Sequence, residues 1–185
     1  MEPPEIGDRP TTADDWLPYL RAYSEWYIAG EGPMALGLLS ERQRAERWLG
    51  SEPATPEQVD AAESRLGVVL PPSLRALYLA SNGVNAVAEW VEELVPCEEL
   101  DWFRETHPEW VEDEPTDEWE TMLASALTLT DGEDAWLLMT SRPTGGGEFA
   151  CYHLEVKYGE FSDEHPSFVE LVRSGARQIA EGREG

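Results

Sequence analysis

Residues 55–83 read TPEQVDAAESRLGVVLPPSLRALYLASNG, and this stretch decides the fold because its helix-capping residues agree with its hydrophobic spacing. Thr55 can cap a helix, Pro56 fits the first helical position, and Gln58 completes a capping box. Apolar residues at helical spacing are expected to face the core: Val59, Ala62 and Leu66. Gly67 fits the left-handed position that ends such a helix.

A second helix is predicted in the same stretch, after an extended entry that Pro71 and Pro72 impose. It begins at Pro72 or Ser73 and presents apolar side chains at helical spacing: Leu74, Leu77 and Tyr78. It ends at Asn82 and Gly83, two residue types that tolerate positive φ. The stretch therefore predicts two consecutive capped helices.

Toward the N-terminus the pattern predicts a disordered tail over residues 1–14 and a single domain over residues 15–182. Asp15 can cap a helix that ends before Gly30, with a buried stripe of aromatic and aliphatic residues: Trp16, Leu20, Tyr23 and Tyr27. A short helix is expected over residues 40–49, capped by Ser40 and terminated by Gly50.

Toward the C-terminus the hydrophobic period changes from helical to extended. We predict a partly extended segment over 86–95, a short helix over 97–107, an acidic loop over 108–115, strands over 126–130, 135–140 and 149–156, and a closing helix from Ser167. Turns are expected at 131–132 and 145–147. Helices followed by strands and a helix indicate the α+β class.

The helical stretch resembles the signature of a known family. It has the spacing LG..LP..NG, carried by Glu63, Leu66, Gly67, Leu70, Pro71, Leu74, Asn82 and Gly83. The order of motifs around it agrees: WLG at 48–50, LVPCEELDWF at 94–103, DGEDAWLLM at 131–139 and PSFVELV at 166–172. Over about residues 15–175 the chain thus resembles the SMI1/KNR4 family, also called the SUKH superfamily. Residues 105–120 depart from the pattern as an acidic insertion.

The resemblance implies a twisted, largely antiparallel sheet with helices packed on it, preceded here by an N-terminal helical extension. It implies no catalysis and no cofactor. Bacterial members resemble immunity proteins that bind and neutralise a cognate toxin, often a nuclease, whereas fungal relatives look like scaffolding proteins in cell-wall signalling. The residues that carry the signature have structural explanations, so no function is transferred onto them.

Composition excludes several classes of partner. The 185-residue chain carries 38 acidic and 13 basic residues, a net charge of −25, and Lys157 is its only lysine. Such a chain cannot neutralise nucleic-acid phosphates or dock on an anionic membrane. It has no leader-like or membrane-spanning apolar run, so a cytoplasmic protein is expected.

No arrangement of residues supports an enzyme or a metal site. Cys97 and Cys151 lack a nucleophile context and a CxxC spacing, and free thiols fit a cytosolic chain better than a disulfide between them. A zinc site built from both cysteines with His107 and His153 is outweighed by ordinary core positions. The glycines at 145–147 lack the lysine and helix of a phosphate loop, and the acidic residues at 131–134 lack the ligand series of a calcium loop.

The informative feature is an acidic and aromatic segment over residues 89–120. It holds fourteen acidic residues and one basic residue, Arg104, a local net charge of −13. Its tryptophans and carboxylates are candidates for binding a partner: Trp90, Glu92, Glu93, Glu98, Glu99, Asp101, Trp102, Glu105, Trp110, Glu112, Asp113, Glu114 and Trp119. Each tryptophan taken singly also fits a core position. As a set, aromatic anchors in an acidic surround favour a basic protein partner.

From the residues and the resemblance together we expect a non-catalytic immunity protein that binds a basic toxin domain, with a nuclease as the best-fitting type. The alternative is an intracellular scaffold resembling the fungal members. A neighbouring toxin gene would favour the first, and an isolated gene would favour the second.

Overall fold

The computed structural model describes residues 2–31, 39–111 and 118–183. The elements in chain order are α1 (Ala13–Gly30), α3 (Glu41–Glu46), α4 (Pro56–Leu66), α5 (Pro72–Ala80), β1 (Val84–Ala88), β2 (Val91–Leu94), η1 (Cys97–Glu99), β3 (Asp101–Trp102), α6 (Phe103–Thr106), η2 (Pro108–Trp110), α7 (Glu118–Ala124), β4 (Ala126–Thr128), β5 (Thr130–Gly132), β6 (Ala135–Gly145), β7 (Glu148–Glu155), β8 (Glu160–Phe161) and α8 (Phe168–Gly182). Helices, strands and a final helix follow one another, which confirms the predicted α+β class.

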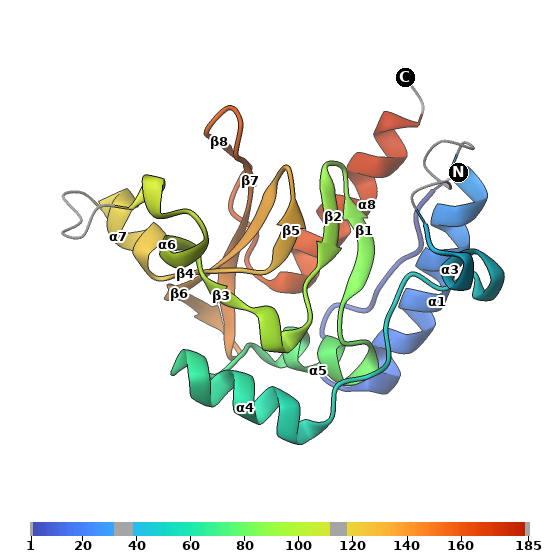
Figure 1. Cartoon of the computed structure of the whole chain (residues 1–185), viewed down its shortest axis with the longest axis horizontal. Helices are drawn as coiled ribbons and strands as arrows, with labels where there is room; N and C mark the ends of the chain where they lie inside the picture. The colour runs from blue at the N-terminus through green and yellow to red at the C-terminus, as the bar shows by residue number, and fades with distance from the viewer. Residues whose placement is uncertain (1, 32–38, 112–117, 184–185) are drawn as a thin grey trace.

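The strands within the described residues form two antiparallel sheets. The smaller has the order β1-β2-β5, and the larger has the order β3-β4-β6-β7-β8. Figure 1 shows α8 running behind the strands, α1 and α3 at one side, and α4 and α5 below. Helix α8 packs against β1 and β7, and α1 packs against α5, where Trp16 Nε1 donates to the Ser73 carbonyl at 2.9 Å. The predicted antiparallel arrangement with an N-terminal helix is therefore confirmed.

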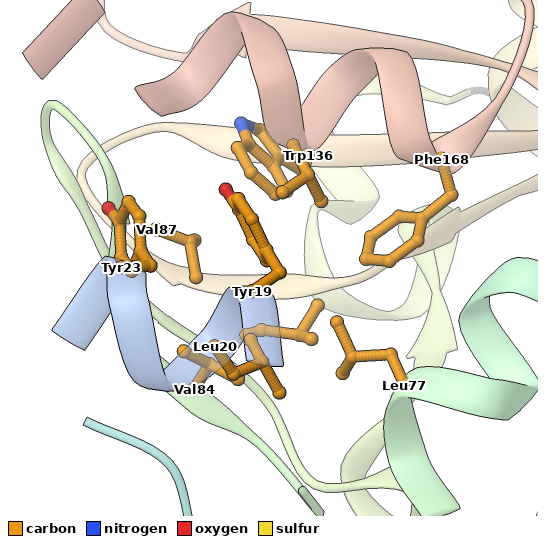
Figure 2. A pocket seen from close by; sticks show the side chains of 10 residues that line it. Tyr19, Leu20, Tyr23, Leu77, Val84, Val87, Trp136 and Phe168 are labelled. Carbon is orange, nitrogen blue, oxygen red and sulfur yellow. The ribbon is translucent and has the colours of Figure 1, made fainter. Parts of the chain in front are cut away.

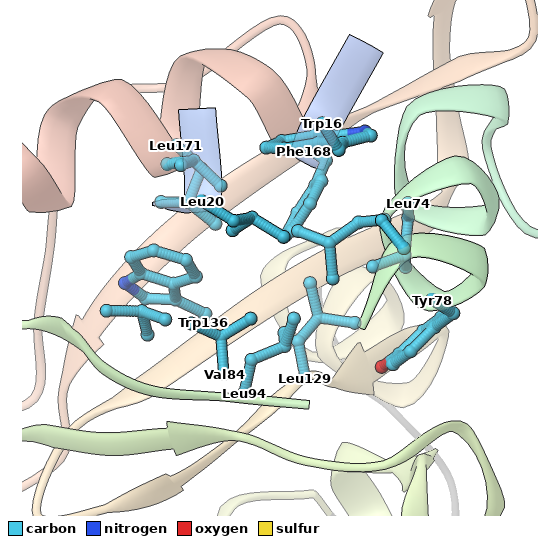
Figure 3. Packing of buried hydrophobic residues seen from close by; sticks show 14 of the residues in the cluster. Trp16, Leu20, Leu74, Tyr78, Val84, Leu94, Leu129, Trp136, Phe168 and Leu171 are labelled. Carbon is cyan, nitrogen blue, oxygen red and sulfur yellow. The ribbon is translucent and has the colours of Figure 1, made fainter. Parts of the chain in front are cut away.

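The long β6 strand separates two cores because its side chains alternate between the faces of the larger sheet. Trp136 and Leu138 enter the main core, whereas Leu137 and Met139 enter a smaller core beneath α6 and α7. Figure 3 shows how the main core gathers side chains from distant segments: Trp16, Leu20, Leu74, Tyr78, Val84, Leu94, Leu129, Trp136, Phe168 and Leu171. Apolar side chains from both ends of the chain are buried in this one core, and their burial stabilises the fold.

Helices α4 and α5 form as their local sequence predicts. Gln58 N donates to Thr55 Oγ1 at 3.2 Å, and the Thr55 amide donates back to the Gln58 side chain at 2.8 Å, which completes the capping box. Gly67 ends α4 in a left-handed conformation with φ 70°. The closing helix predicted from Ser167 is α8, which begins at Phe168 after Ser167, whose hydroxyl accepts from the Glu170 amide.

The N-terminal boundary differs from its prediction. Helix α1 is capped by Thr12, and Asp15 lies in the first turn, where its carboxylate accepts from the Thr12 amide at 2.9 Å. Residues 2–11 contain no helix or strand, yet Ile6 is buried and its carbonyl accepts from Arg173 of α8 at 2.7 Å. This segment therefore contacts the domain where a disordered tail is predicted. The domain limits at 15 and 182 stay a prediction.

Helix α3 begins after its predicted cap, Ser40, but ends at Arg47 in a left-handed conformation and not at Gly50. The predicted helix over 97–107 is wrong. The segment instead contains η1, the short strand β3 and α6, because Asp101 and Trp102 pair with β4. The turn expected at 131–132 is also wrong, since these residues belong to β5 and pair with β2. In both places strand pairing overrides the local pattern.

Candidate protein-binding site

A small cavity lies beside α1, lined by residues of the main core. Figure 2 shows Tyr19, Tyr23, Trp136 and Phe168 around it. Its volume is about 10 Å³, room for about one water molecule. A small-molecule ligand cannot enter it.

The thiols are unsuited to nucleophilic chemistry. Cys97 and Cys151 are both free and fully buried. Burial raises the pKa of Cys97 to about 12 and that of Cys151 well above its usual range, so both are protonated at neutral pH. Among the described residues, no group of three or more His, Cys, Asp or Glu side chains is placed to hold a metal ion. Within the same residues, no helix is long and apolar enough to cross a membrane.

Three turns meet at one edge of the molecule, the upper edge in Figure 1, and we call this the three-turn edge. The β1–β2 turn is residues 89–90, the β5–β6 turn is 133–134, and the β7–β8 turn is 156–159. Together with α8 they surround an open hollow of about 400 Å³, the edge hollow, lined by Glu89, Trp90, Glu133, Asp134, His153, Glu155, Lys157, Tyr158 and Gln178.

Trp90 forms the tip of the β1–β2 turn, with 63% of its surface exposed. Its φ of 61° lies in the left-handed region, which is rare for a bulky side chain. Neighbouring backbone holds it there: Asp134 N donates to the Trp90 carbonyl at 3.1 Å. Gly132 packs so closely that a Cβ atom at that position would lie 2.7 Å from the same carbonyl oxygen. The fold thus holds the Trp90 backbone in a strained conformation while its indole stays exposed.

Tyr158 also lines the edge hollow, from the β7–β8 turn, and is 66% exposed. Its amide donates to the Glu155 carbonyl at 3.1 Å, and Gly159 follows at φ 68°, which closes the β7–β8 turn. The Lys157 ammonium lies 5.2 Å from the centre of the Tyr158 ring. Two large aromatic rings therefore line one hollow while most of their surface faces water, an arrangement typical of binding sites.

A buried pair lies at the base of the edge hollow. His153 Nε2 and Asp134 Oδ2 are 3.0 Å apart, and both side chains are more than nine-tenths buried. The His153 amide donates to Ser162 Oγ at 3.0 Å, which fixes the strand beneath the ring. The pair therefore places a buried imidazole and a buried carboxylate side by side at the base of the edge hollow.

Acidic side chains surround the edge hollow and continue beyond it. Glu89, Glu133 and Glu155 are exposed at its rim. A second hollow of about 320 Å³ shares Asp134 and adds Glu99 and Asp131.

Glu93 lies on β2, and its pKa responds to the carboxylates around it. Burial raises its pKa above the usual range. Neighbouring carboxylates act in the same direction: Asp131, Glu99 and Glu92. The three-turn edge and the adjoining strand β2 therefore form one strongly negative surface.

The structure distributes the predicted binding residues unevenly. Trp90 lies at the edge hollow, Glu99 at the second hollow, and Glu92 and Glu93 on β2 beside them. Glu98 instead accepts from Gln58 Nε2 at 2.6 Å and Asn82 Nδ2 at 2.8 Å, Asp101 accepts from the Trp102 amide, and Glu105 lies 3.6 Å from Arg104. The predicted residues Glu112, Asp113 and Glu114 lie outside the described residues.

The other predicted tryptophans contact the protein itself. Trp102 is partly buried against the main core. Trp110 meets Phe103 edge-on at 6.3 Å between ring centres, and Trp119, 37% exposed, packs edge-on at 4.5 Å against Phe161. None of these three lines the edge hollow.

Sequence analysis missed Tyr158, Glu133 and Glu155 because they lie far from the acidic segment in the chain. Only their place in turns of an antiparallel sheet brings them to Trp90. The turn chemistry at Tyr158 and Gly159 is a signal that could have identified the β7–β8 turn.

The signature residues have structural roles. Glu63 accepts from the Leu70 amide at 2.9 Å and from Arg75 at 2.9 Å, which joins α4 to α5. Asn82 Oδ1 accepts from the Cys97 amide at 2.9 Å. Gly83 has φ 110°, and a Cβ atom there would lie 3.0 Å from the Leu94 carbonyl oxygen. The apolar members, among them Leu66, Leu70 and Leu74, are buried in the main core.

The chain was compared with curated proteins and with models of protein families. No curated protein matches the chain. The family model of the SMI1 / KNR4 family (SUKH-1) matches residues 53–174, from the entry to α4 into the first half of α8, while α1 and α3 precede the match. Because this match covers well over half of the chain and includes every residue of the LG..LP..NG signature, the chain belongs to the SMI1/KNR4 family (SUKH-1).

Proposed function

We propose that the chain is a cytoplasmic, non-catalytic immunity protein that neutralises a cognate toxin by binding a basic domain of it through the three-turn edge. Proteins of the SUKH group are typically toxin immunity proteins, which supports the class. The observation that carries the assignment of the site is the edge hollow, where Trp90 and Tyr158 stand exposed among carboxylates. Exposed aromatic anchors within a charged surround are typical of binding hot spots.

The charge supports a basic partner. The chain carries a net charge of −25, and the rim of the edge hollow carries three glutamates, Glu89, Glu133 and Glu155, against one lysine, Lys157. Nucleases hold phosphates in cationic clefts, so a nuclease domain is the type of toxin that this surface fits best. Neutralisation would be steric and electrostatic: the acidic edge covers the cleft, and its field increases the rate of encounter.

The test is binding to the purified domain of any toxin that is found encoded beside this gene. The double variant Glu133→Arg/Glu155→Arg reverses charge at the edge hollow, and we expect it to lose most of the affinity. The control Glu52→Arg/Glu57→Arg makes the same change in net charge at exposed positions before and within α4, at the opposite end of the molecule in Figure 1, and should bind nearly as the wild type does. Equal losses in both variants would contradict the site, and no binding by the wild type would contradict the immunity function.

A further inference from the structure

We propose that the edge hollow is a receptor for one arginine side chain of the partner, with the guanidinium held between Trp90 and Tyr158 and paired with carboxylates of the rim and base. This inference rests on the proposed function, because it names the chemical group by which the partner is recognised at that site.

The exposed rings are the first observation. In the described residues, the exposed large apolar side chains are few: Val69, Trp90, Trp119 and Tyr158. Two of these border the same hollow, although they come from turns far apart in the chain. A flat cation inserted there would cover both rings and gain cation–π attraction.

The charges are the second observation. Glu89, Glu133 and Glu155 face a single ammonium, that of Lys157, at the rim of the edge hollow. At the base, Asp134 Oδ2 pairs with His153, while Asp134 Oδ1 has no hydrogen-bond partner among the described residues. One free carboxyl oxygen on a buried side chain, beneath a rim of carboxylates, can accept from a guanidinium.

The chain's own cations indicate which group fits best. Two guanidinium carbons of the chain lie over tryptophan rings, that of Arg21 at 4.1 Å from the centre of Trp48 and that of Arg183 at 4.2 Å from the centre of Trp26. A planar, weakly hydrated guanidinium can stack on a ring and bind a carboxylate at once, which an ammonium cannot. Lys157 supplies one positive charge at the rim of the hollow.

Arginine binding can be measured without the toxin, using the acetylated and amidated peptide Gly-Arg-Gly. The probe signal is the indole N–H resonance of Trp90 in the ¹⁵N–¹H spectrum, assigned by its loss in Trp90→Phe. We expect a saturable shift with the arginine peptide, at least about threefold weaker binding of the lysine peptide, and no saturation with the citrulline peptide, which has the same shape without the charge.

Variants test each part of the hollow. Tyr158→Ala and Glu133→Gln/Glu155→Gln should weaken binding of the arginine peptide. Lys157→Gln should strengthen binding, because this substitution removes the competing cation. Val69→Ala is the control, since Val69 is 73% exposed and does not line the hollow. All these positions are exposed, so the variants should remain folded.

The outcomes separate this inference from the proposed function. Equal shifts with arginine and citrulline peptides, or no saturable shift of Trp90, would overturn the arginine receptor even if the toxin binds. Saturable arginine binding by a chain that does not bind the toxin would support the receptor and contradict the immunity function.

Discussion

Trp90 shows, at the scale of one residue, a conflict between stability and binding. A left-handed backbone costs an L-residue about 1–2 kcal/mol, and a largely exposed indole recovers little of this by burial. Glycine adopts this conformation freely but loses about 0.5–1 kcal/mol more chain entropy on folding. Trp90→Gly should therefore leave the free energy of unfolding unchanged or raise it by up to about 1 kcal/mol.

The same substitution should abolish most of the toxin affinity. Urea unfolding and calorimetric titration of one preparation measure both quantities. A loss of stability of more than about 2 kcal/mol would show that the indole supports the fold and is not held for a partner.

Signature residues should behave in the opposite way, affecting stability and not binding. A Cβ atom at Gly67 would meet nothing within 4 Å, so Gly67→Val costs only backbone strain, about 1 kcal/mol or more. Leu74 is fully buried, and Leu74→Ala should cost about 2–5 kcal/mol. Thermal melts measure both losses. An unchanged midpoint for Leu74→Ala, or a lower toxin affinity of the folded variants, would contradict a purely structural role.

Between elements, Glu98 connects α4, the segment after α5, and η1. Its carboxylate accepts from Gln58 and Asn82, and the hydrogen bond from Asn82 is the main cause that lowers its pKa in the folded protein. The pKa of Glu98 is lower in the folded protein than in the unfolded chain. The ionised carboxylate therefore stabilises the fold at pH values above the pKa of the unfolded chain, and this contribution is lost as the pH falls through the pKa of the folded protein.

Glu98→Gln should therefore destabilise the protein at neutral pH, and the difference from wild type should shrink as the solution is acidified below about pH 4. Urea unfolding at several pH values measures the difference. Glu93→Gln is the matched control, because burial raises the pKa of Glu93 and its pH dependence should have the opposite sign. A constant difference across pH for Glu98→Gln would contradict the argument.

The elements also show what sequence can predict. Helices α4, α5 and α8 are specified locally, since their caps and apolar stripes lie within the residues that form them. The segment from Cys97 to Thr106 is not, because the pairing of Asp101 with Thr128 decides its conformation across the sheet. Likewise the acidic segment draws attention to Trp90, but the sequence does not show that Tyr158 lines the same hollow, because sheet pairing brings the two turns together.

At the scale of the whole molecule, the net charge of −25 opposes folding through self-repulsion. Salt relieves this repulsion, because the Debye length falls from about 10 Å at 0.1 M to about 3 Å at 1 M. We expect the thermal midpoint to rise with sodium chloride over this range. A midpoint that falls with added salt would show that the ion pairs of this chain, such as Arg75 with Glu63, outweigh the repulsion.

The same screening should act on binding in the opposite direction. Steering by an acidic edge affects encounter, whereas contacts of Trp90 and Tyr158 affect the lifetime of the complex. Salt should therefore lower the association rate constant while leaving the dissociation rate constant almost unchanged.

Stopped-flow association of the chain with its cognate toxin domain, from about 0.05 M to about 0.5 M salt, tests the central claim most directly. The proposed recognition of a basic partner by the three-turn edge predicts that the association rate constant falls about tenfold or more over this range, and that Glu133→Arg/Glu155→Arg flattens the dependence. A rate constant that is the same at low and high salt would contradict it and would place the binding site on an uncharged face of the domain.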